Sequence, residues 1–182
     1  MCGIVGYTGV HEAAPVLLAG LRRLEYRGYD SAGVATVSNG RLILRKRAGR
    51  VRTLEEALEL EPAPGRIGIS HTRWATHGSA SDRNAHPHVG GRRSEPTVAV
   101  VHNGVIENHS LLRAELEGDG FVFLSQTDTE VIAHLIAREL GDDDDLFGAV
   151  QRALPRLEGT YGLAVVSPRC PGRIVGARQV SA

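Results

Sequence analysis

The dipeptide Asn39-Gly40 constrains the fold of this chain more than any other local feature. It separates two strand-like segments, residues 33–38 (GVATVS) and 41–47 (RLILRKR). Asn-Gly between such segments favours a two-residue type I′ turn, because both central residues of that turn need positive φ. A turn of this kind joins neighbouring antiparallel strands. The sequence therefore predicts an antiparallel hairpin near the start of the chain.

Helices and strands are interleaved along the rest of the chain. Helices are expected at residues 12–26, 109–117, 129–140 and 146–157. One further short helix is expected to follow the capping-box pair Thr53 and Glu56. Additional strands are expected at residues 2–7, 66–70, 97–102, 121–124, 160–166 and 173–177. Hairpins interleaved with helices predict a layered, largely antiparallel α+β fold.

Two more local expectations concern the C-terminal half and the centre of the chain. The acidic run at residues 142–145 is expected to cap the helix that follows it, since acidic groups are favoured near helix N-termini. The last strand has no element to cover its edge, so we expect the domain to be C-terminally incomplete. Residues 71–96 show no period and form a long loop, and such loops are usually functional.

Length and composition predict a single globular domain over residues 1–182. The hydrophobic share is 42% and the charged share 23%, which is ordinary globular usage. Twenty-one basic residues balance 21 acidic ones, which argues against nucleic acid or an anionic membrane bound by bulk charge. The chain has two cysteines, no signal-peptide pattern and no apolar run near the ~18 residues of a membrane span. We therefore expect a soluble, cytoplasmic protein.

Cys2 is the first candidate catalytic residue. A small residue at the second position generally permits removal of Met1, which leaves Cys2 with both a thiol and a free α-amine. The amine has a reference pKa of ~7.7 to 8.0 and the thiol one of ~8.5, so the amine can accept the thiol proton near neutral pH. The alternative is a small buried hydrophobic residue at the start of a strand, which is common for free cysteine.

Residues 71–78 (HTRWATHG) form a second candidate, where a strand gives way to the long loop. The Arg73 guanidinium offers a planar fork that suits a carboxylate, and Thr76 and His77 add hydrogen-bonding groups. Trp74 is the only tryptophan of the chain. The alternative for Arg73 is an ordinary solvated surface residue.

Two further candidates lie at the ends of predicted elements. Asn103 and Gly104 follow a strand, and a side-chain amide beside a glycine N–H is a pair of donors for a developing oxyanion. The alternative at this place is a simple Asn-Gly turn. Asp128 stands just before a helix, where it either caps the first turn or pairs with the ammonium group of a ligand.

A metal site is disfavoured. Four histidines, His71, His77, His86 and His88, fall within the long loop, and His86-Pro87-His88 has the form of a two-ligand clip. The chain has no HExxH motif, no cysteine pair at ligand spacing and no obvious carboxylate ligand beside these histidines. A metallohydrolase is therefore kept as a third hypothesis, and we expect no metal.

Six motifs, in order and over nearly the whole chain, resemble one family. They are MCGIVGY at residues 1–7, LRRLEYRGYDSAG at 21–33, HTRWATHG at 71–78, NAHPH at 84–88, VHNGVIENH at 101–109 and TDTEVIAHL at 127–135. Together they resemble the N-terminal glutaminase domain of glucosamine-6-phosphate synthases, a branch of the class II glutamine amidotransferases. The resemblance implies the N-terminal-nucleophile hydrolase fold, with two stacked antiparallel sheets between helix layers in an αββα order.

The resemblance also implies roles for individual residues. The catalytic group consists of Cys2, with its α-amine as base, and of Asn103 and Gly104 as the oxyanion hole. Substrate glutamine would be held through its α-carboxylate by Arg73 and through its α-ammonium by Asp128. The remaining implied roles are closure over glutamine for Thr76 and His77, a place near the ammonia passage for Trp74, and support of the nucleophile for Arg27 and Gly28.

The implied activity is hydrolysis of L-glutamine through a γ-glutamyl thioester on Cys2, without a metal or organic cofactor. In the family, ammonia passes to sugar-isomerase domains that bind fructose 6-phosphate, and these domains are absent from this chain. The full-length enzyme is expected to be a homodimer. The second hypothesis is a non-catalytic, truncated remnant that binds glutamine, and the final residues 178–182, which depart from the family's pattern, favour it.

Overall fold

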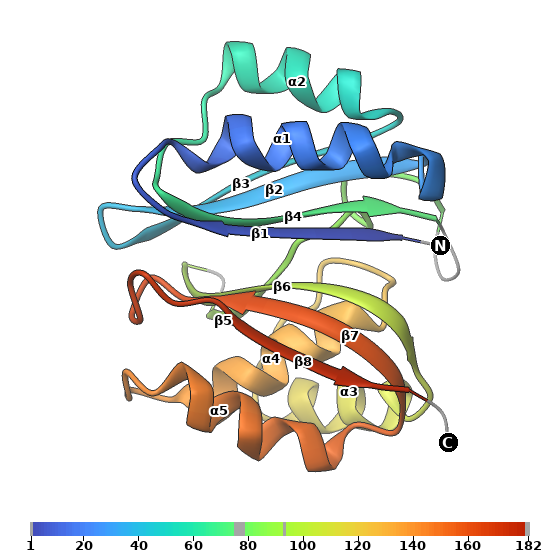
Figure 1. Ribbon diagram of the computed structural model, residues 1–182. Helices are drawn as coiled ribbons and strands as arrows, with labels where there is room; N and C mark the ends of the chain where they lie inside the picture. The colour runs from blue at the N-terminus through green and yellow to red at the C-terminus, as the bar shows by residue number, and fades with distance from the viewer. Residues whose placement is uncertain (1, 75–78, 93, 181–182) are drawn as a thin grey trace.

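The computed structural model describes residues 2–74, 79–92 and 94–180, and they build four layers (Figure 1). Two four-stranded antiparallel sheets face each other in the middle. The first sheet has the order β1 (Gly3–Thr8), β4 (Ile67–Arg73), β2 (Ser31–Ser38), β3 (Arg41–Ala48). The second has the order β5 (His88–Arg92), β6 (Glu95–Ile106), β7 (Gly159–Val166), β8 (Val175–Gln179). The predicted layered α+β fold is confirmed.

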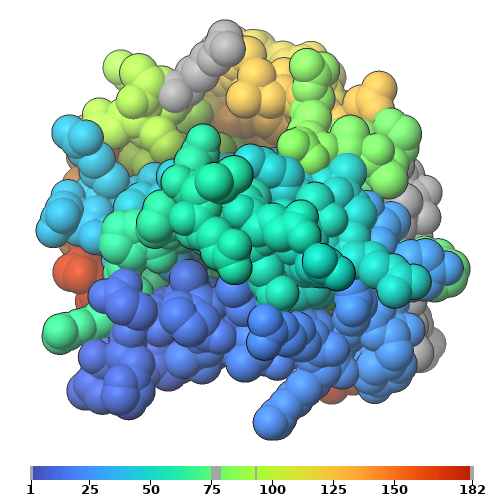
Figure 2. Space-filling view, turned by 90° about the horizontal axis from the view of Figure 1, so that it is seen from above, coloured from blue at the N-terminus to red at the C-terminus, as the bar shows by residue number. Residues whose placement is uncertain are grey.

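Helices cover the outer face of each sheet. The first sheet is covered by α1 (Ala13–Leu24), which continues into the 3₁₀ turn Glu25–Arg27, and by α2 (Val51–Leu60). Figure 2 shows α2, in teal, across the centre of this face, with blue N-terminal residues beside it. The second sheet is covered by α3 (His109–Gly118), α4 (Thr129–Leu140), α5 (Leu146–Ala153) and the 3₁₀ turn Leu154–Arg156. None of the described helices is both long and apolar enough to cross a membrane.

Three apolar layers hold these elements together. The layer between the sheets consists mainly of small and β-branched side chains, namely Ala35, Val37, Ile67, Ile69, Ala99, Val101, Ala164 and Val166. The layer under α1 and α2 is anchored by Leu17, Leu21 and Leu54, which are fully buried. The largest layer lies on the other side, where most residues of α4 are buried between the second sheet and its neighbouring helices. Burial of this area supplies most of the driving force for folding.

Local sequence signals were sufficient at several turns and helix ends. Asn39 and Gly40 both have positive φ, 50° and 71°, and join β2 to β3 in antiparallel register. The predicted type I′ hairpin is therefore confirmed. The Asp145 carboxylate accepts a hydrogen bond from the Gly148 N–H at 3.0 Å, so the predicted acidic cap of α5 is confirmed as well.

Three predictions of local structure were wrong. Helix α2 begins at Val51 and not after Thr53, because the Glu25 carboxylate accepts the Val51 N–H at 2.9 Å and caps the helix from a distant segment. Residues 121–124 form no strand. The predicted long loop, residues 71–96, contains the end of β4, all of β5 and the start of β6. Strands β4 and β6 pair with partners remote in sequence, and β5 pairs with the neighbouring β6.

Candidate active site

A pocket of about 380 Å³ opens where the N-terminus of β1 and the end of β4 meet β6 of the second sheet. Residues from both sheets and from the start of α4 line it. They are Cys2, Arg27, Arg73, Trp74, His86, His102, Asn103, Gly104, Val105, Thr127, Asp128 and Thr129. The pocket therefore brings together seven of the residues that the sequence singled out.

The Cys2 thiol lies beside the end of β4. Antiparallel pairing of Gly3 with Thr72 places Cys2 next to Trp74, whose N–H donates to Sγ at 3.3 Å. Burial raises the pKa of this thiol, while the Trp74 N–H and the Arg73 guanidinium act to lower it. Because the net shift is upward, the thiolate form of Cys2 would need a nearby base to form at neutral pH.

Asn103 joins the two sheets at the pocket. Its side-chain Nδ2 donates to the backbone carbonyl of Cys2 at 2.9 Å, so a side-chain amide from β6 lies directly beside Cys2. Gly104 follows it with φ of +141°. A Cβ at this position would lie 2.0 Å from the Thr160 carbonyl oxygen on β7, so only glycine fits here. The strand thus holds the amide and the glycine N–H next to Cys2.

Asp128 does not cap the helix that it precedes. It stands at the N-cap position of α4 without a side-chain capping hydrogen bond. Its Oδ2 instead accepts the Ile106 N–H at 2.9 Å and lies 3.9 Å from His102 Nδ1. The carboxylate is therefore held from β6, on the wall of the pocket, where it supplies negative charge.

His102 and Thr129 line the pocket next to the Asp128 carboxylate. His102 Nδ1 lies 3.0 Å from Thr129 Oγ1, and Nε2 lies 3.5 Å from the Thr160 carbonyl. Since a carbonyl only accepts, Nε2 carries the proton and Nδ1 accepts from the Thr129 hydroxyl. Burial lowers the pKa of His102, although the Asp128 carboxylate acts in the opposite direction.

Arg27 and Arg73, which the sequence singled out, line the pocket, and Gly28 lies next to them. Arg73 is buried, with 4% of its surface exposed, and its Nη1 donates to the Ser79 carbonyl at 3.4 Å. Arg27 lines the pocket from the 3₁₀ turn after α1. Gly28 packs so closely against β4 that a Cβ would lie 2.8 Å from the Arg73 carbonyl. The Trp74 ring makes an edge contact with Tyr29, with ring centroids 5.3 Å apart.

Thr76 and His77, which the sequence also singled out, lie outside the described residues.

Three buried histidines pack together, and one of them, His86, lines the pocket. The rings of His71 and His86 have centroids 4.2 Å apart, and those of His86 and His88 4.9 Å apart. Burial lowers the pKa of His71 to about 3 and the pKa values of His86 and His88 well below the usual range. Among the described residues, no group of three or more His, Cys, Asp or Glu side chains is arranged to hold a metal ion.

Sequence reasoning missed several pocket residues. They are His86, which was considered only as a metal ligand, and His102, Val105, Thr127 and Thr129. His102 and Val105 flank the predicted Asn-Gly pair, and Thr127 and Thr129 flank the predicted aspartate. Their position next to predicted residues was the only available signal, because which neighbour faces the pocket depends on strand and helix geometry.

A cysteine at residue 2, directly before the first strand of an αββα sandwich and beside an Asn-Gly pair, defines the class: an N-terminal-nucleophile glutamine amidotransferase of class II. Two solved structures are similar over 92% of this chain. One, the Bacillus subtilis glutamine phosphoribosylpyrophosphate amidotransferase, has a TM-score of 0.76 and 28% identity, and 35% of that chain is covered. The other, an allosteric regulatory enzyme of purine biosynthesis, has a TM-score of 0.77 and 30% identity, and 36% of it is covered.

Sequence comparison identifies the family. Residues 71–180 match the profile of the glutamine amidotransferase domain, and this chain belongs to that family. Curated relatives cover the whole chain. The glutamine–fructose-6-phosphate aminotransferases (isomerizing) of Symbiobacterium thermophilum and Pseudomonas aeruginosa are 59% and 56% identical to it. The chain spans 29% of the length of these relatives.

Proposed function

We propose that this chain hydrolyses L-glutamine to glutamate and ammonia, with Cys2 as the nucleophile. The observation that carries the proposal is the pocket in which the Cys2 thiol, the Asn103 amide and the Asp128 carboxylate come together from the two sheets and the start of α4. A thiol beside two oxyanion donors suits attack on the side-chain amide of glutamine. The Asp128 carboxylate, on the wall of the same pocket, suits the α-ammonium group of that substrate.

The proposed reaction proceeds through a γ-glutamyl thioester. After loss of Met1, which lies outside the described residues, the α-amine of Cys2 takes the thiol proton. The thiolate attacks the amide carbon, and Asn103 and Gly104 donate to the resulting oxyanion. The carbon–nitrogen bond then breaks, and the amine's proton goes to the departing ammonia. Water, deprotonated by the same amine, attacks the thioester carbon. The carbon–sulfur bond then breaks, glutamate leaves, and the amine's proton returns to the Cys2 sulfur.

The proposed recognition of glutamine uses charges of both signs. The Arg73 guanidinium would pair with the α-carboxylate and Asp128 with the α-ammonium. We assign Thr76 and His77 to closure over the substrate, Trp74 to the onward path of ammonia, and Arg27 and Gly28 to support of the nucleophile. The raised pKa of Cys2 supports the need for the amine as a base.

The whole protein is proposed to be a glutamine–fructose-6-phosphate aminotransferase. Relatives of that name match this chain with their first part and are more than three times as long. In this proposal the ammonia passes to a sugar-isomerase domain outside the chain, which binds fructose 6-phosphate. We further propose a cytoplasmic homodimer for the whole protein.

Intact mass and covalent labelling test the proposal. The wild-type chain is expected to lack Met1, to release ammonia from glutamine and to gain one adduct with an electrophilic glutamine analogue. Cys170→Ser is the matched control, since Cys170 is a buried free thiol remote from the pocket, and it should label like the wild type. Cys2→Ser should neither label nor release ammonia.

An oxyanion variant sharpens the test. Asn103→Ala is expected to lower kcat by about 10²- to 10³-fold, the usual loss for one oxyanion donor. If glutamine stabilises the folded wild-type chain but no ammonia appears, the chain is a glutamine-binding remnant. If chelators abolish activity while Cys2→Ser keeps it, the chain is a metallohydrolase.

A further inference from the structure

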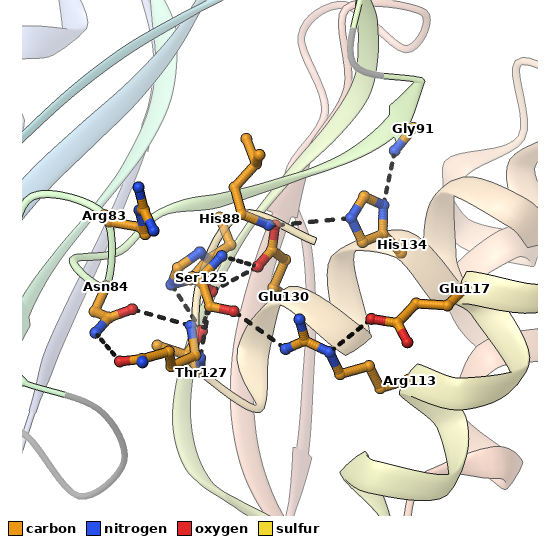
Figure 3. Close-up of polar contacts among 12 residues, drawn as sticks. Arg83, Asn84, His88, Gly91, Arg113, Glu117, Ser125, Thr127, Glu130 and His134 are labelled. Carbon is orange, nitrogen blue, oxygen red and sulfur yellow. Dashed lines mark hydrogen bonds and ion pairs between the residues drawn. The ribbon is translucent and has the colours of Figure 1, made fainter. Parts of the chain in front are cut away.

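A buried polar network surrounds the start of α4 and the residues before it, and one of its members, Thr127, also lines the pocket (Figure 3). Its centre is Glu130, in the first turn of α4, whose side chain is 5% exposed. A buried carboxylate is costly unless several donors satisfy it. The hydrogen-bond donors to Glu130 therefore show which segment of the chain this carboxylate holds in place.

Glu130 reaches back along the chain to the segment before the helix. Its Oε1 accepts the Leu124 N–H at 2.8 Å, and its Oε2 accepts both the N–H and the hydroxyl of Ser125 at 2.6 Å. These are short, charge-assisted hydrogen bonds. They close a loop over residues 124–130, and Asp128 lies inside that loop.

The charge of Glu130 is matched by its surroundings. Burial acts to raise the pKa of Glu130, but the nearby His134 ring, 3.8 Å away, and the hydrogen bonds from Ser125 and Leu124 outweigh it and lower the pKa to about 2. The Lys46 ammonium, whose Nζ donates to the Arg83 carbonyl, also interacts with this carboxylate. The carboxylate is therefore ionised at neutral pH, as its donors require.

The same loop is held from its other side. The Asn84 side chain accepts the Gln126 N–H at 3.0 Å and donates to Gln126 Oε1 at 3.3 Å. Thr127 Oγ1 lies 3.0 Å from both Ser125 Oγ and His88 Nε2, as Figure 3 shows. Every residue from 124 to 127 is thus fixed by a side chain or by Glu130.

We propose that Glu130 is a positioning residue that fixes the loop of Asp128 and thereby sets the affinity of the pocket for an α-ammonium group. The inference rests on the proposed function, since it assumes that Asp128 pairs with that ammonium. Glu130 itself does not line the pocket and touches no substrate. Its effect passes through the closed loop to the Asp128 carboxylate.

The test compares two ligands that differ in one group. L-Glutamate carries the α-ammonium, and glutarate has the same carbon chain and both carboxylates without it. Calorimetric titration of the wild-type chain should show tighter binding of glutamate. In Glu130→Gln, the Kd of glutamate should rise about tenfold, because hydrogen bonds to a charged group are replaced by weaker ones, while the Kd of glutarate stays within about twofold.

Controls separate positioning from general damage. Glu139→Gln removes a charge from the far end of the same helix and should leave both constants unchanged. Ser125→Ala is a milder variant that removes one donor to Glu130, and it should raise the glutamate constant about threefold. It decides the case if Glu130→Gln does not fold.

The outcomes of the two proposals are distinguishable. Absence of ammonia release from the wild type defeats the proposed hydrolysis and leaves the binding comparison valid. A wild type that binds glutamate no better than glutarate overturns the positioning inference. So does a folded Glu130→Gln or Ser125→Ala chain with the wild-type ratio of the two constants, or one in which both constants rise equally.

Discussion

Mild acid should destabilise this domain through its buried histidines. His71, His86 and His88 pack together beside the pocket, and burial keeps all three neutral by lowering their pKa values. In the unfolded chain the same side chains have the ordinary pKa of ~6.5. Below that value the unfolded state binds protons that the folded state does not, so the free energy of unfolding falls as pH falls.

The magnitude follows from the number of histidines. Each histidine with a folded pKa below about 5.5 costs about 1.4 kcal/mol between about pH 7.5 and pH 5.5, so three cost about 4 kcal/mol. A domain of this size has only ~5 to 15 kcal/mol in total. Glu130 does not mask the effect, because a carboxyl with a lowered pKa contributes fully above its unfolded value of ~4.3 and loses that contribution only below it.

Urea unfolding at a series of pH values, followed by circular dichroism, measures this loss. These three histidines should contribute about 4 kcal/mol per pH unit to the slope of the unfolding free energy near pH 5.5, and His102, whose pKa burial also lowers, adds to that slope. His11→Gln replaces an exposed histidine and should leave the slope unchanged. His86→Gln should reduce it by about 1.4 kcal/mol per unit, if the fold tolerates the change. A flat profile between about pH 7.5 and 5.5 would refute the reasoning, since it would mean that these histidines are not kept neutral.

Two structural predictions concern single side chains. Gly104→Ala should lower the melting temperature and abolish ammonia release, because its Cβ would lie 2.0 Å from the Thr160 carbonyl at a φ that disfavours alanine; a variant with wild-type melting and activity would contradict this. Leu135→Ala should cost about 2 to 5 kcal/mol in chemical denaturation, since Leu135 is fully buried, whereas Leu111→Ala, at a side chain 77% exposed, should cost less than about 0.5 kcal/mol; equal losses would contradict the assigned core.

Local signals predicted the elements whose causes are local. The Asn39-Gly40 turn and the acidic cap at Asp145 depend on residues a few positions apart, and both were found. Helix α4 matched its predicted range, because its apolar spacing and the terminating Gly141 lie within one segment. The order of elements predicted a layered α+β fold, whereas the αββα order of the layers was implied by the family resemblance.

The failures have long-range causes. Phe121 and Phe123 gave residues 121–124 a strand-like pattern, yet both rings pack against α4, with the Phe123 ring centroid 4.7 Å from that of His134. The Leu124 N–H is taken by Glu130 and not by a neighbouring strand. Strand β5 was not predicted, because its glycine-rich sequence has no strand pattern of its own. Its backbone pairing with β6 and its packing against α4 hold it in the sheet.

The sequence predicted which residues belong to the candidate site, but not how they come together in space or which residues hold them there. Motifs singled out Cys2, Arg73, Asn103 and Asp128, and the described structure brings these four into one pocket. The residues that hold them, such as His102 beneath Asp128, carry no motif of their own in a single sequence. Which polar neighbour serves the site depends on where the second sheet docks, and no local pattern encodes that.

The hydrogen bond from Asn103 to Cys2 has a consequence for how activity is acquired. The two residues are 101 positions apart and come from opposite sheets. Neither half of the sandwich can bring Cys2 and the Asn103 amide together by itself, and contacts this remote in sequence are slow to form. During refolding, ammonia release should return only when the two sheets dock, after the circular dichroism signal of the helices has returned. The rate at which ammonia release returns would therefore report the final packing step.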